Sequence, residues 1–161
     1  MGYVLEKAIW TDADFEVMGW HDATLHALAV RQDDYRLLFD LDYIFKWVHP
    51  SPPEQNFSFW VAPVTLVFEG VQAIKIDLSC TYIESFTLQG LERSDPRPMA
   101  TPSLLDWAWR LECNEGEITF RAHGFAQFVR LPPMFSSRQT LTLEERGEIS
   151  VALPEHLRRP Q

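Results

Sequence analysis

The chain has 161 residues, of which 46% are hydrophobic and 13% aromatic, and its net charge is −9. This length suits one domain, which we place at residues 1–161, and the apolar content excludes an intrinsically disordered chain. The acidic balance argues against nucleic acid as a partner, because phosphate binding needs a basic face. It is typical of an ordinary acidic soluble protein or of one with a basic protein partner.

The N-terminal sequence has no charged region followed by an apolar run, and no window approaches the ~20 apolar residues of a membrane helix. We therefore expect neither a signal peptide nor a contact with a membrane. The two cysteines, Cys80 and Cys113, are too few for a disulfide scaffold and lie in strand-like sequence. We expect both to be buried free thiols, which is typical of a cytoplasmic protein.

The chain begins with a segment, residues 1–18, that has no clear periodicity beyond a short helical turn capped by Thr11 or Asp12. Residues 23–30 could be helical by propensity, but we predict a strand, because Asp33-Asp34 follows as a turn and residues 35–44 alternate as a second strand. In that second strand the two faces differ in polarity. One face carries Tyr35, Leu37, Phe39, Leu41 and Tyr43, and the other carries Arg36, Leu38, Asp40, Asp42 and Ile44.

Further strand-like segments follow, separated by turns and by two proline-rich loops. The predicted strands are 57–68, 71–80, 83–93, 104–113, 117–131 with a bend at Gly124, 139–143 and 146–151, and the predicted loops are 49–56 and 94–103. Pro63 lies inside a predicted strand, so a bulge or an edge is expected there. The polar tail, residues 154–161, is expected to fray. The pattern predicts a mainly β fold with little helix, a single-domain antiparallel sandwich or rolled barrel of eight or nine short strands.

The first candidate site is the predicted hairpin, where His21 and Asp22 begin one strand and Asp40 and Asp42 lie on the other. Two carboxylates on one strand face lie roughly 7 Å apart, so they could act as an acid/base pair or, with His21, bind a metal ion. The alternative is a solvated strand face, with Asp22 in a turn and the two aspartates in salt bridges to Arg36, Lys75 or Arg121.

The second candidate is an aromatic surface beside the first proline-rich loop. Its predicted partner-binding or ligand-binding residues are Trp20, Tyr43, Trp47, His49 and Trp60. Tryptophan and tyrosine anchor many interfaces, whereas burial would make the same residues core. A third polar group, formed by Arg121, His123, Gln127 and Arg130, could bind an anion or could be an ordinary solvated face.

Short motifs of the common enzyme classes, such as a glycine-rich phosphate loop, are missing from the sequence, and we expect no cofactor. Four stretches (20–22, 41–44, 62–68 and 124–127) resemble a group of small uncharacterised bacterial single-domain proteins that look like toxin-neutralising immunity proteins. The resemblance implies a small binding domain that inhibits a bacterial toxin. Unpaired edge strands would allow a homodimer, so we expect a monomer or a homodimer. The alternative hypothesis is a metal-dependent or carboxylate acid/base hydrolase centred on the hairpin.

Overall fold

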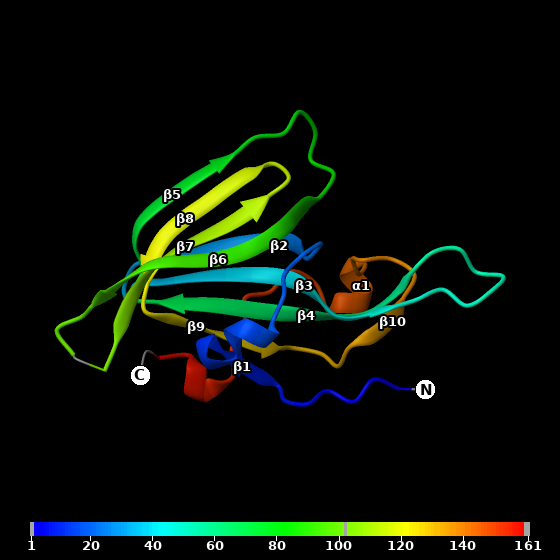
Figure 1. Ribbon diagram of the computed structural model, residues 1–161, viewed down its shortest axis with the longest axis horizontal. Helices are drawn as coiled ribbons and strands as arrows, with labels where there is room; N and C mark the ends of the chain where they lie inside the picture. Colours follow the sequence, from blue (N-terminus) through cyan, green and yellow to red (C-terminus); the bar gives the residue numbers. More distant parts are fainter. Residues whose placement is uncertain (1, 102, 160–161) are drawn as a thin grey trace.

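The computed structural model describes residues 2–101 and 103–159 and shows an antiparallel β fold (Figure 1). Strands take up 52% of the chain and helices 8%, which confirms the prediction of a mainly β fold with little helix. Ten strands lie in the described residues. They are β1 (Ile9–Thr11), β2 (Thr24–Arg31), β3 (Arg36–Val48), β4 (Ser58–Glu69), β5 (Gln72–Leu78), β6 (Phe86–Pro98), β7 (Leu105–Cys113), β8 (Gly116–Ala122), β9 (Gly124–Val129) and β10 (Met134–Ser136).

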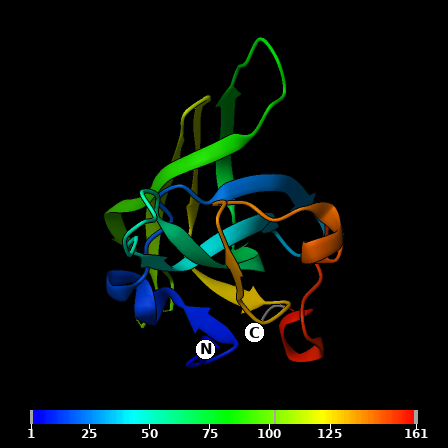
Figure 2. The same ribbon diagram turned by 90° about the vertical axis from the view of Figure 1, so that its right-hand side faces the viewer.

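All ten strands belong to one continuous sheet in the order β1-β9-β4-β3-β2-β6-β7-β8-β5, with β10 beside β4. The sheet is narrow at one join, where β2 and β6 share only the pairs Thr24–Thr87 and Leu25–Phe86. Here the sheet folds over into two layers, as the view in Figure 2 shows. We call the part from β1 to β2, with β10, the first layer and the part from β6 to β5 the second layer.

The main hydrophobic core lies between the two layers. Leu37, Phe39 and Leu41 of β3 are completely buried and pack with Trp109 and Phe120 of the second layer. This confirms that the apolar face of the second hairpin strand points inward, because strand side chains alternate between faces. The fold therefore leaves the other face of β3, with its two aspartates, on the outside of the first layer.

The C-terminal residues cover that outer face, in contrast to the sequence prediction. The predicted strand at 139–143 is wrong: this stretch leads into the helix α1 (Leu143–Arg146), and residues 147–151 continue as coil. The tail is not frayed up to residue 159, because the 3-10 helix η2 (Glu155–Leu157) buries Leu157 against Leu38 and Val67. Residues 160 and 161 lie outside the described part of the chain. An outward apolar face needs a cover, and this segment provides it.

The N-terminal segment packs on the sheet through β1, which pairs with β9. The predicted helical turn is confirmed as the 3-10 helix η1 (Asp12–Val17). Its N-cap is Thr11, which forms a capping box with Asp14. The strand β6 runs further than predicted, to Pro98, so the predicted loop at 94–103 begins later. Pro102 of that loop lies outside the described residues. None of the helices in the ranges 2–101 and 103–159 has the length and apolar character needed to span a membrane.

Pro63 lies in β4, a central strand, and not at an outer edge of the sheet. Its carbonyl accepts a hydrogen bond from the Arg130 N–H, so its nitrogen also faces the side of β4 away from β3. On that side β9 ends its pairing at Val64 and β10 begins at Val61. The missing N–H of proline therefore falls in the gap between two partner strands, where the sheet loses no hydrogen bond.

Candidate functional site

The two aspartates of the hairpin are not on a solvated face, as the alternative interpretation of the sequence supposed. Asp40 and Asp42 are both fully buried under the C-terminal segment. A buried charge is costly unless it is paired and hydrogen-bonded. The neighbours of each carboxylate oxygen therefore decide what this site can do.

Asp40 is bound by two arginines and one backbone amide. Its Oδ1 accepts hydrogen bonds from Arg130 Nη2 and Arg146 Nη2, both at 2.5 Å. Its Oδ2 accepts from Arg146 Nη1 at 2.8 Å and from the Ser150 N–H at 2.9 Å. Burial alone would raise the pKa of Asp40, but these donors outweigh it and hold the pKa below its ordinary value. Asp40 is therefore a fixed, ionised carboxylate.

Asp42 is also held by several donors. Its Oδ1 accepts from Arg146 Nε at 3.0 Å, and its Oδ2 accepts from His26 Nε2 and Thr140 Oγ1, both at 2.8 Å, and from the Leu141 N–H at 2.9 Å. Burial acts to raise the pKa of Asp42, and the bonds from His26 and Leu141 together with the charge of Arg146 lower it overall. We call Asp40, Asp42, Arg130, Arg146 and His26 the carboxylate cluster.

Local structure around α1 explains how Arg146 reaches the cluster. The side chain of Thr142 accepts from the Glu145 N–H, and the side chain of Glu145 accepts from the Thr142 N–H, which closes a capping box. Gly147 ends the helix in the left-handed conformation, with φ 71°. The capping box and the left-handed Gly147 fix the two ends of this four-residue helix. Arg146 is its last residue, and its side chain is buried against β3.

The salt-bridge partners proposed from the sequence are wrong. Arg36 pairs with Glu69 at 2.9 Å, and Arg121 pairs with Asp106 at 2.5 Å. Two guanidinium groups, from Arg130 and Arg146, face the two aspartates instead. Both oxygens of Asp40 and the Oδ2 of Asp42 accept at least two hydrogen bonds each, and the Oδ1 of Asp42 accepts one from Arg146. Because both side chains are also fully buried, neither carboxylate is open to a substrate or a metal ion.

His21 and Asp22 do not join the carboxylate cluster. The side chain of His21 is 62% exposed, and its ring stacks on Trp47 at 6.3 Å between centroids. Asp22 accepts a hydrogen bond from Gln139 Nε2 at 2.8 Å. Gln139 directly precedes Thr140, whose hydroxyl donates to Asp42. Within residues 2–101 and 103–159, no group of three histidine, cysteine or carboxylate side chains could hold a metal ion. The predicted metal and catalytic residues therefore lie near one another without forming one site.

The predicted aromatic surface divides into buried and open parts. Trp20 and Tyr43 are core residues, 3% and 6% exposed; Trp20 Nε1 donates to Gln127 Oε1, and the Tyr43 hydroxyl accepts from the Gly19 N–H. They are not available to a partner. Trp47 is 38% exposed and contacts Phe57, on which the ring of His49 also packs at 4.8 Å.

Trp60 lies in an open apolar groove at the same end of the molecule. We call this the aromatic groove; it has a volume of about 640 Å³ and is lined by Gly2, Tyr3, Val4, Lys46, Val48, Trp60 and Phe135. Phe135 of β10 lies opposite Trp60 of β4, with ring centroids 5.3 Å apart, and it is 58% exposed. Tyr3 contacts the other side of Trp60 at 5.8 Å. Sequence reasoning missed Tyr3 and Phe135, because both lie in segments that had no clear strand pattern.

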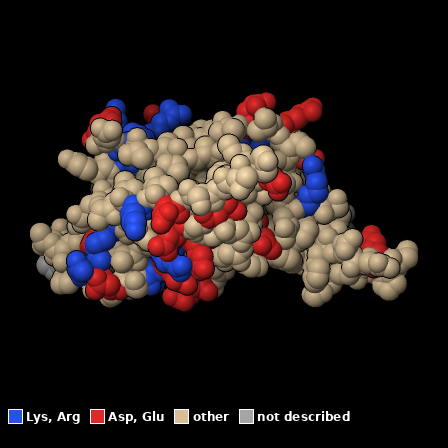
Figure 3. Space-filling model, turned by 90° about the horizontal axis from the view of Figure 1, so that it is seen from above, with Lys and Arg blue, Asp and Glu red and all other residues tan. Residues whose placement is uncertain are grey.

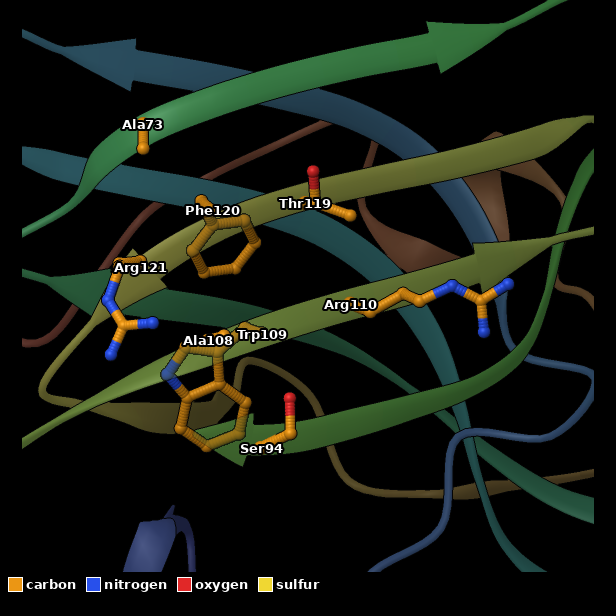
Figure 4. Close-up of a pocket in the computed structure, with 8 residues that line it drawn as sticks. All are labelled: Ala73, Ser94, Ala108, Trp109, Arg110, Thr119, Phe120 and Arg121. Atoms are coloured by element: carbon orange, nitrogen blue, oxygen red, sulfur yellow. The ribbon is translucent and has the colours of Figure 1, made fainter. Parts of the chain in front are cut away.

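A shallow hollow also lies on the outer face of the second layer. Small side chains, among them Ala73, Ala108 and Thr119, line it together with Trp109 and Phe120, and Figure 4 shows Arg110 and Arg121 at its two ends. Both arginines are already paired: Arg110 with Glu92, Glu112 and Glu117, and Arg121 with Asp95 and Asp106. Figure 3 shows acidic and basic side chains side by side on the molecule. The hollow therefore has no spare positive charge for an anion.

The third polar group of the sequence does not form one face either. Arg121 lies on the second layer, Arg130 binds Asp40 beneath the C-terminal segment, and Gln127 is buried against Trp20. His123 lies beside Met99, with its Nδ1 3.1 Å from the sulfur. The alternation that suggested a shared surface was broken by the bend between β8 and β9.

The cysteines differ from each other. Cys113 is buried as predicted, and burial, aided by Glu115 and Glu112, raises its pKa to about 11. Cys80 is exposed, so the prediction that both thiols are buried is wrong for this residue. Both are free thiols, and the raised pKa of Cys113 argues against an activated nucleophile at that position, since such a group needs a lowered pKa.

Comparison of the chain with known protein families, with curated proteins and with solved structures found no match.

Proposed function

We propose that this protein is a binding domain that captures a basic protein partner through the aromatic groove. The observation that carries the proposal is Phe135, 58% exposed beside Trp60 in a groove that the fold leaves open. Exposed apolar side chains gathered in a concave site are characteristic of interaction surfaces. Aromatic residues are the commonest anchors of such surfaces.

The charge of the chain supports a basic partner. Its net charge of −9 would attract a positively charged protein over distances of about a Debye length, roughly 8 Å at physiological ionic strength. Apart from Lys46, the residues that line the groove are apolar or aromatic, so the contact itself requires an apolar or aromatic side chain from the partner. Long-range attraction and a local apolar anchor together specify the class of partner: a basic protein with an exposed hydrophobic residue.

An immunity-type inhibitor of a bacterial toxin, which the resemblance implied, is one specific case of this proposal. Binding to nucleic acid requires a basic face for the phosphate contacts, so a toxin that acts on nucleic acid would be a partner of the required charge. The two free cysteines support a reducing compartment such as the cytoplasm. The hydrolase alternative is less well supported, because the carboxylates that it needs are occupied by internal ion pairs.

The test is affinity capture from cells that natively produce the protein, at low salt, with three baits: the wild type, Phe135→Ala and Ile149→Ala. Ile149 is 55% exposed but lies outside the groove, so its variant controls for the general loss of an apolar side chain. We expect one basic protein to be retained by the wild type and by Ile149→Ala and to be lost with Phe135→Ala. Equal retention by all three baits would contradict the proposal.

A further inference from the structure

The strand β5 lies at one end of the sheet and has a free edge. It pairs with β8 on one side, and no strand of residues 2–101 and 103–159 pairs with it on the other. Its inward side chains Ile74 and Ile76 are 39% and 45% exposed, although they point to the core side of the layer. The loop after β5 adds Tyr82 and Ile83, which are 78% and 85% exposed. An apolar free edge of this kind is a template for another strand.

The hydrogen-bond pattern fixes which groups this edge presents. The Ser79 N–H donates to the Glu115 carbonyl, in the same register as the pairs Asp77–Glu117 and Lys75–Thr119. In antiparallel pairing, alternate residues turn their backbone groups to the same side. The backbone groups of Ile76 and Leu78 therefore point to the free edge and have no partner strand.

We propose that β5 pairs with β5 of a second copy of this chain, in an antiparallel register centred on Ile76. The two-fold axis then passes between the two Ile76 residues, which exchange their free backbone hydrogen bonds. Lys75 of each copy lies opposite Asp77 of the other. The inward residues Ile76 and Leu78 continue the apolar surface of the layer across the interface.

The charges on β5 select this register over its neighbours. A shift in one direction places Lys75 opposite Lys75, and a shift in the other places Asp77 opposite Asp77. Like charges directly opposite each other destabilise strand pairing, whereas opposite charges stabilise it. These side chains form the non-hydrogen-bonded pairs of the interface, in which the side chains are closest.

The same two residues explain why the partner is a second copy and not an arbitrary strand. A lysine in the middle of an edge strand normally discourages pairing. Pairing is favourable when an antiparallel partner strand places an acidic residue opposite Lys75 and a basic residue opposite Asp77. A second copy of β5 meets both conditions. The edge is therefore complementary to itself.

A charge-swap experiment tests the proposal with the full chain. Sedimentation equilibrium should give a dimer for the wild type that dissociates on dilution. Lys75→Asp and Asp77→Lys should each remain monomeric, with a dissociation constant at least about tenfold higher, because each places like charges opposite each other at two positions. An equimolar mixture of the two variants should dimerise again, because each then supplies the charge that the other needs.

Lys75→Asp with Asp77→Lys in one chain should also dimerise. Far-UV circular dichroism and thermal unfolding of each variant should match the wild type, which separates loss of pairing from loss of folding. A wild type that stays monomeric at millimolar concentration would overturn the proposal. So would a dimer that both single variants leave unchanged.

Discussion

Removal of the Arg146 guanidinium is the sharpest test of whether the carboxylate cluster holds the C-terminal segment on the first layer. In Arg146→Ala, the fully buried Asp40 and Asp42 lose three hydrogen bonds from a group that is itself buried. The Glu148 carbonyl loses a fourth. Breaking a buried ion pair by removing one partner costs about 3–5 kcal/mol, because a charge is left uncompensated. For a chain of this size, that loss lowers the melting temperature by roughly 6–20 °C.

The matched control is Arg138→Ala. Arg138 pairs with Glu145 at 2.9 Å on the surface, where the two side chains are 50% and 41% exposed. A pair of this kind contributes only about 0–1 kcal/mol. The assay is urea unfolding of both variants, followed by fluorescence of the buried tryptophans, with free energies from linear extrapolation.

Two further measurements identify the cause of the loss. Asp40→Ala combined with Arg146→Ala should cost less than the sum of the single changes, with a coupling energy of about 0.5–3 kcal/mol. The effect of Arg146→Ala should also shrink in acid, since protonated aspartates no longer need the cation. If Arg146→Ala is no more destabilising than Arg138→Ala at neutral pH, the cluster does not hold the C-terminal segment as described.

Three other predictions concern pH, thiols and a turn. The folded-state pKa values of Asp40 and Asp42 are lowered, so the stability that they contribute is present above the unfolded-state pKa of about 4 and is lost as the pH falls below it. Denaturant unfolding between pH 7 and pH 3 measures this loss, and a free energy of unfolding that does not change with pH would argue against it. A thiol reagent at neutral pH should label Cys80 rapidly and Cys113 only after unfolding, as counted by mass spectrometry. Gly116→Ala should lower the free energy of unfolding by at least about 1–3 kcal/mol, the cost of backbone strain at φ +142°, and the clash of a Cβ 1.9 Å from the Asp77 carbonyl oxygen adds to this cost.

The sequence predicted those parts of the fold that depend on neighbouring residues. The turn at Asp33-Asp34 and the alternation after it correctly indicated the β2–β3 hairpin, and Leu37, Phe39 and Leu41 do point into the core. The period of two is a local property, so it can be read without knowledge of the partner strand. The same alternation placed Asp40 and Asp42 correctly on the opposite face.

The environment of that opposite face could not be predicted in the same way. Asp40 meets Arg146 across 106 positions of the chain, and nothing near Asp40 in the sequence indicates that the C-terminal segment covers it. Residues 139–151 show a weak alternation of apolar and polar side chains, which resembles the pattern of a strand. In the structure, the Thr142–Glu145 capping box starts a helix there instead. Likewise, the sequence indicated Trp60 as a candidate anchor but not its neighbour Phe135. The two lie side by side because β10 pairs with β4, a contact between segments far apart in the sequence.

The most direct test of the proposed function is site-specific photo-crosslinking in cells that natively produce the protein. A photoreactive phenylalanine analogue would replace Phe135 in one variant and Ile149, exposed to a similar extent, in another. We predict that position 135 forms a covalent adduct with one basic protein and that position 149 does not. An adduct at 149 and none at 135, with both variants folded, would contradict the assignment of the aromatic groove as the binding surface.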